Sequence, residues 1–334
     1  MASKQATKPY EAPTTTSIEI EGSVLLSLIR HTSENYPSLY SGSLLGFEDD
    51  SGAVDITHAY PFPYPDQYEG GSLRSRSGNK YQQEILDALT SLGQGVEFQG
   101  WFQSTISGNF VTSQLVEALA QQQLVNKNAF ILIHNMASIG KEVELKALRL
   151  SENFLTTYSK GKWKTRDLES NKLSFFNIFD ELTINIHNQH LVNMYLAQTS
   201  DVFAATGESE NLTFNSNSNM TTQLLESLCS QVDSYNFDQT NFNYYQRQLQ
   251  KEHTKILQWK QNRKAENDER AKVGQPELDP EEWKTIFKGP NGPSRLNNTL
   301  FSRSIDEFAD DILKQCDEEL IKSFAIERKL TANN

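Results

Sequence analysis

The stretch Gly100-Trp101-Phe102-Gln103-Ser104-Thr105, with the sequence that follows it to Val116, decides the fold. It predicts a buried strand over 96–101 that breaks into a glycine-containing loop and then enters a helix over 113–123, with Ser113 as the N-cap. Junctions of this kind commonly carry catalytic side chains, because the scaffold holds them rigid while the loop leaves them exposed. Yet no His, Cys, Asp or Glu occurs between Gly100 and Val116. The position where chemistry is expected therefore holds only amide, hydroxyl and apolar groups.

Outward from this junction, apolar alternation and helical spacing predict one mixed α/β domain over residues 17–205, with a mixed sheet flanked by helices. Residues 1–16 precede it. They are polar, contain two prolines and lack the apolar core of a signal peptide, so we expect a flexible tail. The expected strands are 17–22, 40–46, 54–60, 130–133, 143–150 and 184–188, and the expected helices outside the junction are 23–30 and 81–92.

The C-terminal third of the chain has a different pattern. A polar stretch rich in asparagine and serine over 206–220 is expected to be a linker. Residues 221–330 then show helical periodicity. A heptad-like apolar stripe runs from Leu225 to Ile256, the charged residues 261–272 extend it, and a second amphipathic helix follows a proline-rich loop. Two lone helices cannot bury this much apolar surface between themselves, so we expect them to pack on something else.

The composition excludes several classes of function. The 334 residues carry a formal net charge of −12, which argues against a protein whose main task is to grip the phosphate backbone of nucleic acids. The two cysteines, Cys229 and Cys316, are far apart in the sequence, so neither a disulfide framework nor a thiolate zinc site is expected. The longest apolar run, 129–133, is far shorter than the roughly 20 residues of a membrane-spanning helix. We therefore expect a soluble cytoplasmic or nuclear protein, of which we favour the cytoplasmic, with no membrane partner and no strong direct contact with nucleic acid.

Six histidines decide whether a metal site is expected elsewhere in the chain. Only His187 and His190 are close in sequence, and a pair with this spacing on a helix can bind zinc. No Asp or Glu follows them before Asp201, and 184–188 is expected to be extended, so surface or interface histidines are the favoured interpretation. His134 ends an apolar strand, where a hydrogen-bonded structural role is expected. The sequence contains neither the nucleophile elbow of serine hydrolases nor a phosphate-binding P-loop.

The layout of helix, small-residue strand, hairpin, helix, Gly-Trp-aromatic strand and loop-helix resembles the MPN domain, also called the JAMM fold. Its active members are zinc peptidases that cut isopeptide bonds to ubiquitin and its relatives, with a Glu as general base and a His-Ser-His motif followed by Ser-x-x-Asp. In this chain the motif positions are occupied by Leu39, Gln103, Ser104, Thr105, Ser113 and Val116. Only the two serines fit. Because Gln, Thr and Val stand where three metal ligands would be, the resemblance implies an MPN domain with no metal, no cofactor and no peptidase activity.

The resemblance narrows to one branch of this family. The strand Gly-Trp-aromatic-Gln-Ser-Thr, followed by Gly-x-Phe-Val-Thr, is similar to the h-subunit family of eukaryotic translation initiation factor 3. The C-terminal segments that agree are 145–150, 189–193, 232–236, 276–282 and 287–290. The resemblance implies a non-catalytic scaffold that pairs with a second MPN protein, the f-subunit, and contributes helices to a bundle with PCI-domain subunits. It also implies a place on the small ribosomal subunit, in support of mRNA recruitment and scanning.

Two alternatives stay open from the sequence. One is an MPN-type subunit of a proteasome-lid or signalosome complex, and the other is a zinc isopeptidase with ligands rearranged to His134, His187 or His190. The assembly surface is expected on the apolar stripes of the two C-terminal helices. The competing interpretation is that these helices mainly pack on each other and on the domain. The residues expected on the assembly surface are Leu225, Leu228, Val232, Tyr235, Phe242, Tyr245, Leu249, Ile305, Phe308, Ile312 and Leu320.

Overall fold

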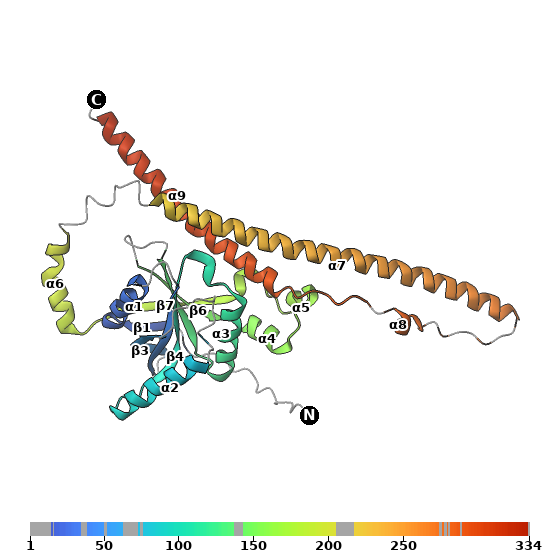
Figure 1. Cartoon of the computed structure of the whole chain (residues 1–334), viewed down its shortest axis with the longest axis horizontal. Helices are drawn as coiled ribbons and strands as arrows, with labels where there is room; N and C mark the ends of the chain where they lie inside the picture. The colour runs from blue at the N-terminus through green and yellow to red at the C-terminus, as the bar shows by residue number, and fades with distance from the viewer. Residues whose placement is uncertain are drawn as a thin grey trace.

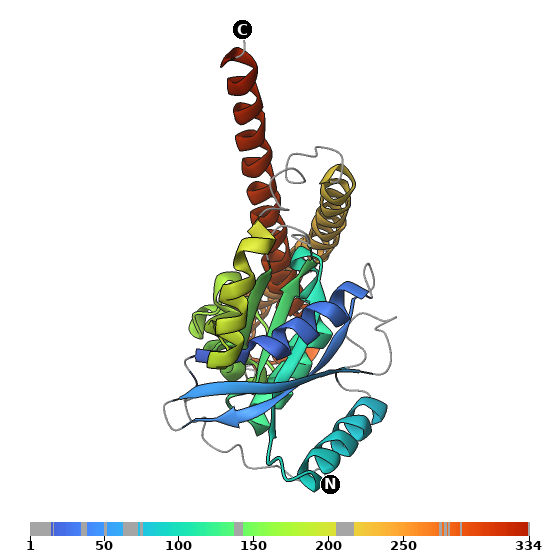
Figure 2. The same ribbon diagram turned by 90° about the vertical axis from the view of Figure 1, so that its left-hand side faces the viewer.

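The structure is a computed structural model of the 334-residue chain. It describes residue 15 and residues 17–34, 39–49, 52–62, 73, 76–136, 143–204, 217–273, 276, 279, 281–287 and 289–332. Figures 1 and 2 show that the N-terminal part of the chain forms a sheet covered by helices. Two long helices from the C-terminal part extend away from this sheet.

A mixed sheet forms the centre of the N-terminal domain (Figure 1). Its strands are β1 (Ser17–Glu21), β2 (Ser41–Glu48), β3 (Ala53–Pro61), β4 (Glu97–Thr105), β5 (Phe130–Asn135), β6 (Glu144–Leu150) and β7 (Phe179–His187). The order around the sheet is β1-β3-β2-β4-β5-β6-β7. Strand β1 pairs in parallel with both β3 and β7, which closes the sheet into a barrel. The mixed sheet is the architecture that the sequence predicts, whereas its closure by β1 and β7 is not visible in the sequence pattern.

Strand β4 is longer than the sequence predicts, because it ends at Thr105 and not at Trp101. Its last six residues, Gly100–Thr105, pair in parallel with the whole of β5, while its other side pairs with β2. The polar side chains at its end do not break the strand, since backbone pairing continues along it and the side chains are buried. Gly100 is needed where the strands approach each other. A Cβ at this position would lie 2.1 Å from the carbonyl oxygen of Phe130.

Helices cover both faces of the sheet. Those of the domain are α1 (Gly22–Glu34), α2 (Arg76–Ser91), η1 (Ser107–Phe110), α3 (Ser113–Val125), α4 (Glu152–Lys160), α5 (Thr165–Ser170), η3 (Phe175–Asn177) and α6 (His190–Ala204). The hydroxyl of Thr112 caps α3 by accepting from the Leu115 N–H, so the predicted cap at Ser113 is wrong by one position. Helices α4, α5 and α6 are absent from the sequence-based prediction. Helix α4 does carry end signals, because Ser151 caps its start and Gly161 ends it with a φ of 62°.

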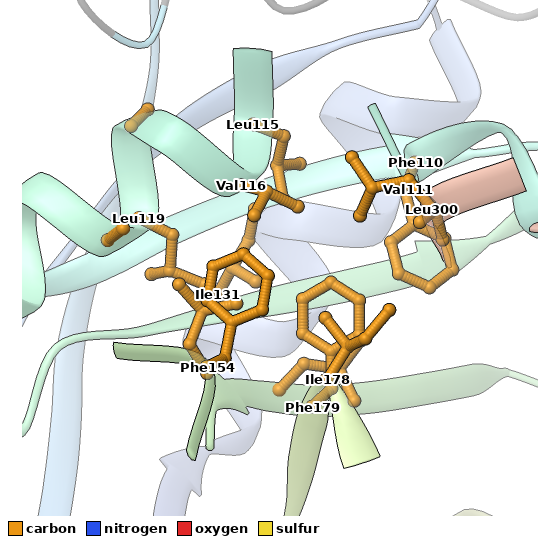
Figure 3. Close-up of a cluster of buried hydrophobic side chains, with 14 of the residues drawn as sticks. Phe110, Val111, Leu115, Val116, Leu119, Ile131, Phe154, Ile178, Phe179 and Leu300 are labelled. Atoms are coloured by element: carbon orange, nitrogen blue, oxygen red, sulfur yellow. The ribbon is translucent and has the colours of Figure 1, made fainter. Parts of the chain in front are cut away.

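Two apolar clusters hold the sheet between its helices. Phe102 of β4 points into a cluster beneath α1, and Trp101 points into the other, which lies between the sheet and the helices α3 and α4. This second cluster also receives Leu300 from the C-terminal helix α9 (Leu296–Ala332), which lies beside Phe110 in Figure 3. Because β4 contributes side chains to both clusters, it is buried on both faces. The beginning of the C-terminal helix is therefore part of the domain core.

The remaining helices are α7 (Asn217–Val273) and α8 (Trp283–Ile286). The first half of α7 lies antiparallel to α9. The hydroxyl of Thr221 donates to Gln315 at 3.2 Å, and Arg295 donates to Gln239 at 3.5 Å. The 57 residues of α7 span about 85 Å, so its second half extends past the domain (Figure 1). The charged residues 261–272 continue this helix, as the sequence predicts.

Two boundaries differ from the expectations. Thr15, placed in the flexible tail by sequence, is buried. Its N–H donates to Asn128 at 3.5 Å and its carbonyl accepts from Arg149 at 2.9 Å, because the chain already lies along the barrel before β1 begins. Helix α7 begins at Asn217, inside the expected linker 206–220. The rest of that linker and residues 1–14 of the tail lie outside the described residues.

Candidate functional site

The motif positions Gln103, Ser104 and Thr105 are the last three residues of β4, and all three side chains are buried. The hydroxyl of Ser104 accepts from the Tyr40 N–H at 2.7 Å and lies 3.2 Å from the Tyr40 carbonyl, to which it donates. The hydroxyl of Thr105 donates to the carbonyl of Ser107 at 3.0 Å. Both hydroxyls therefore hold the backbone at the end of the strand and do not face an open site.

The other motif positions lie at the same end of the sheet. Leu39 is half-buried and stands two residues before Ser41, which pairs with Gln103. Ser113 is the first residue of α3. Val116 lies one turn further and is 0% exposed, within the apolar cluster drawn in Figure 3. The fold thus brings these positions to one region, where the aliphatic side chain of Val116 is part of the apolar core.

The C-terminal helix α9 lies directly against the turn η1 that follows β4. The hydroxyl of Ser304 donates to the Gly108 carbonyl at 3.0 Å, and the hydroxyl of Ser107 donates to the Glu307 carbonyl at 3.4 Å. Phe308 is 0% exposed and packs beside Gly108. Phe308 was expected on the intersubunit surface, but this contact places it inside the chain. The protein's own helix therefore covers the turn that follows the motif residues Gln103, Ser104 and Thr105.

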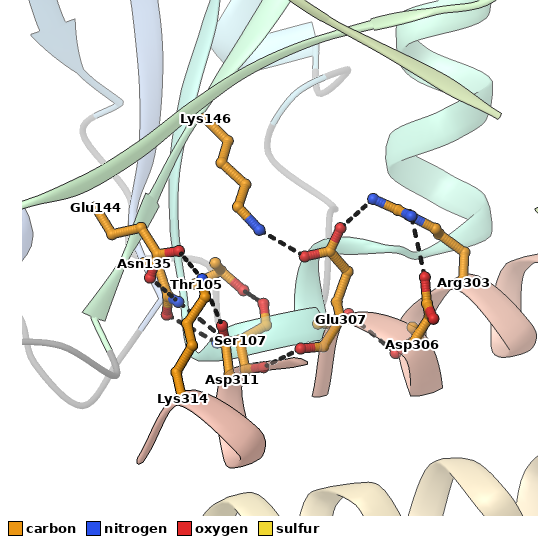
Figure 4. A network of polar contacts seen from close by, with 12 residues as sticks. Thr105, Ser107, Asn135, Glu144, Lys146, Arg303, Asp306, Glu307, Asp311 and Lys314 are labelled. Carbon is orange, nitrogen blue, oxygen red and sulfur yellow. Dashed lines mark hydrogen bonds and ion pairs between the residues drawn. The ribbon is translucent and has the colours of Figure 1, made fainter. Parts of the chain in front are cut away.

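A polar network joins α9 to the ends of β5 and β6 (Figure 4). The side-chain oxygen of Asn135 accepts from the Ser107 N–H at 3.0 Å, and its amide donates to Glu144 at 2.8 Å and to Asp311 at 2.9 Å. Ser107 has a φ of 54°, a left-handed conformation that is uncommon outside glycine, and Asn135 helps to hold it. Burial alone would raise the pKa of Glu144. The hydrogen bond and charge of Lys314, together with the charge of Lys146 and the hydrogen bond of Asn135, outweigh burial and keep this pKa below its ordinary value.

A second set of ion pairs fixes the same helix. The carboxylate of Glu307, whose side chain is buried, accepts from Lys146 of β6 at 2.7 Å and from Arg303 one turn earlier in α9. A buried carboxylate is costly unless it is paired, and here two cations reach it. These ion pairs fix the position of α9 on the domain, in addition to the apolar contacts of Phe308 and Leu300.

The histidines do not form a metal site. His134 is buried in β5 with its Nδ1 2.9 Å from the Thr32 hydroxyl, and burial lowers its pKa, which favours the neutral ring and the structural role expected from sequence. His187 ends β7 and lies 3.9 Å from Asp55, whereas His190 begins α6. The pair therefore does not share a helix. Within the described part of the chain, no three His, Cys, Asp or Glu side chains gather as a metal ion would require.

The residues expected on the assembly surface divide into two groups, apart from Phe308. Leu225, Leu249 and Leu320 are exposed. Half-buried are Leu228, Val232, Tyr235, Phe242, Tyr245, Ile305 and Ile312. The chain itself covers part of this second group, because the Arg295 guanidinium stacks 4.2 Å from the ring of Phe242 and Tyr245 lies beside Gly292. The segment that precedes α9 thus covers part of the stripe, whereas Leu225, Leu249 and Leu320 stay exposed.

The structure also exposes apolar residues that were not expected on the assembly surface. On α7 and α9 these are Phe237, Tyr244, Leu257, Leu313, Ile321 and Phe324, and on α6 they are Leu191, Val192, Met194, Tyr195 and Leu196. The apolar run of α6 is a usable signal in the sequence. The strand expected over 184–188 obscures it, because the helical spacing begins only after that strand ends. In the described part of the chain, no helix is both long and apolar enough to cross a membrane.

Comparison with known proteins agrees with this architecture. A family model described as the C-terminal region of eIF3h matches residues 140–332, and one described as JAB1/Mov34/MPN/PAD-1 ubiquitin protease matches residues 13–128. The H-subunit of eukaryotic translation initiation factor 3 from Yarrowia lipolytica is 35% identical, over 88% of this chain and 93% of the relative. Those of Neurospora crassa and Coccidioides immitis are each 30% identical, over 94% and 89% of this chain and 96% and 91% of the relatives. The chain therefore belongs to the H-subunit family of eukaryotic translation initiation factor 3.

Proposed function

We propose that this protein is a non-catalytic structural subunit of the multisubunit initiation factor 3, held in the complex by its C-terminal helices. The observation that carries the proposal is the exposed apolar surface of α7 and α9, where Leu320 and Phe324 are more than half exposed although they belong to an amphipathic helix. Apolar helical faces of this kind are typical of sites that receive helices of other proteins. Family membership supplies the identity of the complex.

The geometry of the vacated metal position supports the absence of catalysis. Zinc sites of this type need imidazole and carboxylate ligands and an open coordination position for water. Gln103 and Thr105 are buried and Val116 belongs to the apolar core, while α9 covers the adjacent loop. The MPN domain then acts as a packing unit, not as a peptidase.

The finer assignments follow from the family resemblance. The MPN domain, residues 17–205, pairs with the other MPN protein of the complex, the f-subunit. Helices α7 and α9 join a helical bundle with PCI-domain subunits. In this position the protein works in the cytoplasm on the small ribosomal subunit, where it supports mRNA recruitment and scanning. It has no cofactor and no direct grip on nucleic acid, in keeping with its net charge of −12.

Affinity purification of the tagged chain from cells, with mass spectrometry of the proteins that accompany it, tests the proposal. We expect the subunits of initiation factor 3 in stoichiometric amounts. The double variant Leu320→Asp with Phe324→Asp should lose these partners, because it places carboxylates on the exposed face of α9. Leu124→Asp, which changes an exposed leucine on α3, is the matched control and should keep them.

Other outcomes would refute specific parts of the proposal. Proteasome-lid or signalosome subunits in place of initiation factor subunits would assign the chain to a different complex. Normal assembly of the double variant would show that the distal face of α9 is not an assembly surface. One mole of zinc per mole of purified protein, together with cleavage of a ubiquitin chain, would establish an isopeptidase with rearranged ligands.

A further inference from the structure

A groove of about 980 Å³ runs along the first half of α7, on the side where this helix meets α9. Its α7 wall extends from Thr222 to Asn241 at helical spacing, about 28 Å of helix, and α9 adds Asn297 and Phe301. A helix of about 20 residues matches this length. The groove therefore has the dimensions of a site for one helix.

Three large apolar residues line the groove, Leu225, Phe237 and Phe301, and we call them its floor. Leu225 is 46% exposed and Phe237 is 71% exposed, and Phe301 lies alongside them. Side chains spaced by three, four or seven residues along one helix face suit the apolar stripe of an amphipathic partner helix. Exposed aromatic residues in such a groove are the usual anchors of binding energy.

All the charged residues of the lining are acidic, and we call them the rim of the groove. Glu226, Asp233 and Asp238 line it, and no lysine or arginine does. The same imbalance holds for the whole stretch 217–243, which contains these three acidic residues and no basic one. None of the three carboxylates forms an ion pair with a residue that the structure describes. The groove thus combines an apolar floor with uncompensated negative charge.

We infer that this groove binds an amphipathic helix of another protein, about 20 residues long, with lysine or arginine along one flank of its apolar stripe. The inference rests on the proposed function, because it specifies the chemistry of one partner within the assembly. Charge complementarity across an interface selects partners and fixes register, since like charges at the rim reject the wrong helix.

Two segments of this chain are alternative occupants of the groove, but each is less complementary to it than a basic helix of another protein. Helix α6 has an exposed apolar face, but residues 190–204 contain one aspartate and no lysine or arginine, so it cannot complement the rim. The second half of α7 is basic, with Arg247, Lys251 and Lys255 at four-residue spacing, and could enter the groove of a second copy. The net charge of −12 on each copy opposes that pairing.

The first test uses the full chain and two designed helical peptides of about 20 residues. Both carry the same leucine stripe, and one has lysines on its flank where the other has glutamates. Fluorescence anisotropy should show binding of the lysine peptide at least about tenfold tighter than the glutamate peptide, with an affinity that falls as salt is raised. Equal binding of the two peptides, or no binding of either, would overturn the inference.

The two cysteines provide a footprint within the same molecule. Cys229 lines the groove, whereas Cys316 is exposed on α9 outside it. The lysine peptide should protect Cys229 from alkylation and leave Cys316 reactive, as measured by mass spectrometry. Protection of both or of neither would place the peptide elsewhere. Concentration-dependent protection of Cys229 without peptide, together with a dimer by light scattering, would identify a second copy as the occupant and overturn the choice of partner.

Charge reversal separates this inference from the proposed function. Glu226→Lys with Asp233→Lys and Asp238→Lys should reverse the peptide preference and reduce co-purification of initiation factor subunits. The matched control reverses three exposed acidic residues elsewhere, Glu117, Asp268 and Glu269, and should change neither. If the wild-type chain enters the complex and the groove variant enters equally well, the inference fails while the proposed function stands. If the wild-type chain does not enter the complex, the proposed function fails.

Discussion

Replacing Gly108 by alanine adds one methyl group at the contact between η1 and α9. This substitution tests whether α9 packs on the domain as described. The φ of Gly108 is not in the left-handed region, so alanine is compatible with the backbone there. The new carbon would lie 2.5 Å from the carbonyl oxygen of Ser304, 3.0 Å from the ring of Phe308 and 3.2 Å from the Cβ of Glu307. The oxygen and the Cβ belong to the rigid frame of α9. The helix must therefore move by about 1 Å to restore ordinary van der Waals separation.

The cost of this movement follows from the contacts that it disturbs. A shift of about 1 Å takes the Ser304–Gly108 hydrogen bond out of range, which removes about 1 kcal/mol. Overpacking against the fully buried Phe308 adds about 1–3 kcal/mol. We expect Gly108→Ala to lower the free energy of docking by about 2–4 kcal/mol. Hydrogen exchange measured by mass spectrometry should then show faster exchange in residues 300–315 and in η1.

A second glycine provides the control. A Cβ at Gly95 meets nothing within 4 Å, and its φ is also outside the left-handed region. Gly95→Ala should leave exchange in α9 unchanged and should stabilise the fold by up to about 1 kcal/mol, because it restricts the unfolded chain. If Gly108→Ala retains wild-type exchange in α9 and a wild-type free energy of unfolding in urea, then α9 is not seated on η1 as described.

Three further predictions concern single side chains. Lys146→Met should lower the free energy of unfolding by about 1–3 kcal/mol, because it leaves the buried carboxylate of Glu307 with one cation, and an unchanged urea midpoint would contradict this. Val116→Asp should cost more than about 3 kcal/mol, because a carboxylate would enter the apolar core without a partner, and a folded variant with wild-type melting temperature would exclude that environment. Burial lowers the pKa of His134, so its contribution to stability is complete above about pH 6.5 and is lost as the pH falls toward the folded-state pKa. Compared with His134→Gln, the wild type should lose up to about 1.4 kcal/mol per pH unit below about pH 6.5 in urea titrations, and parallel pH profiles would refute this role.

The pattern of the sequence predicted the elements whose signals are local. The strand and helix around Gly100–Val116 and the two C-terminal helices follow from periodicity alone. The closure of the barrel does not, because the parallel pairing of β1 with β7 joins Ile18 to Ile184 and depends on residues far apart in the chain. The end of β4 is also not predictable from local pattern, because polar residues such as Gln103 are typical of a loop and only the pairing with β5 keeps them in the strand.

In the candidate site, too, some features are predictable from the sequence and others depend on contacts between distant residues. The absence of metal ligands at Gln103, Thr105 and Val116 is visible in the sequence. The role of α9 is not, because Phe308 has the same periodic signal whether it faces another protein or the chain's own turn η1. Only the contact with Gly108 distinguishes the two. The acidic rim of the groove is likewise not predictable from helical spacing alone. It depends on which side of α7 remains exposed after α9 has packed against it.

The contact between η1 and α9 also has a consequence for the order of synthesis. The hydrogen bond from Ser107 to Glu307 joins positions 200 residues apart. At a synthesis rate of about 5–20 residues per second, α9 is made roughly 10–40 s after η1. Throughout that interval the apolar side chains around Phe110 lack the cover that Leu300 later provides. A protein of the translation machinery thus spends most of its own translation with one face of its core uncovered by α9.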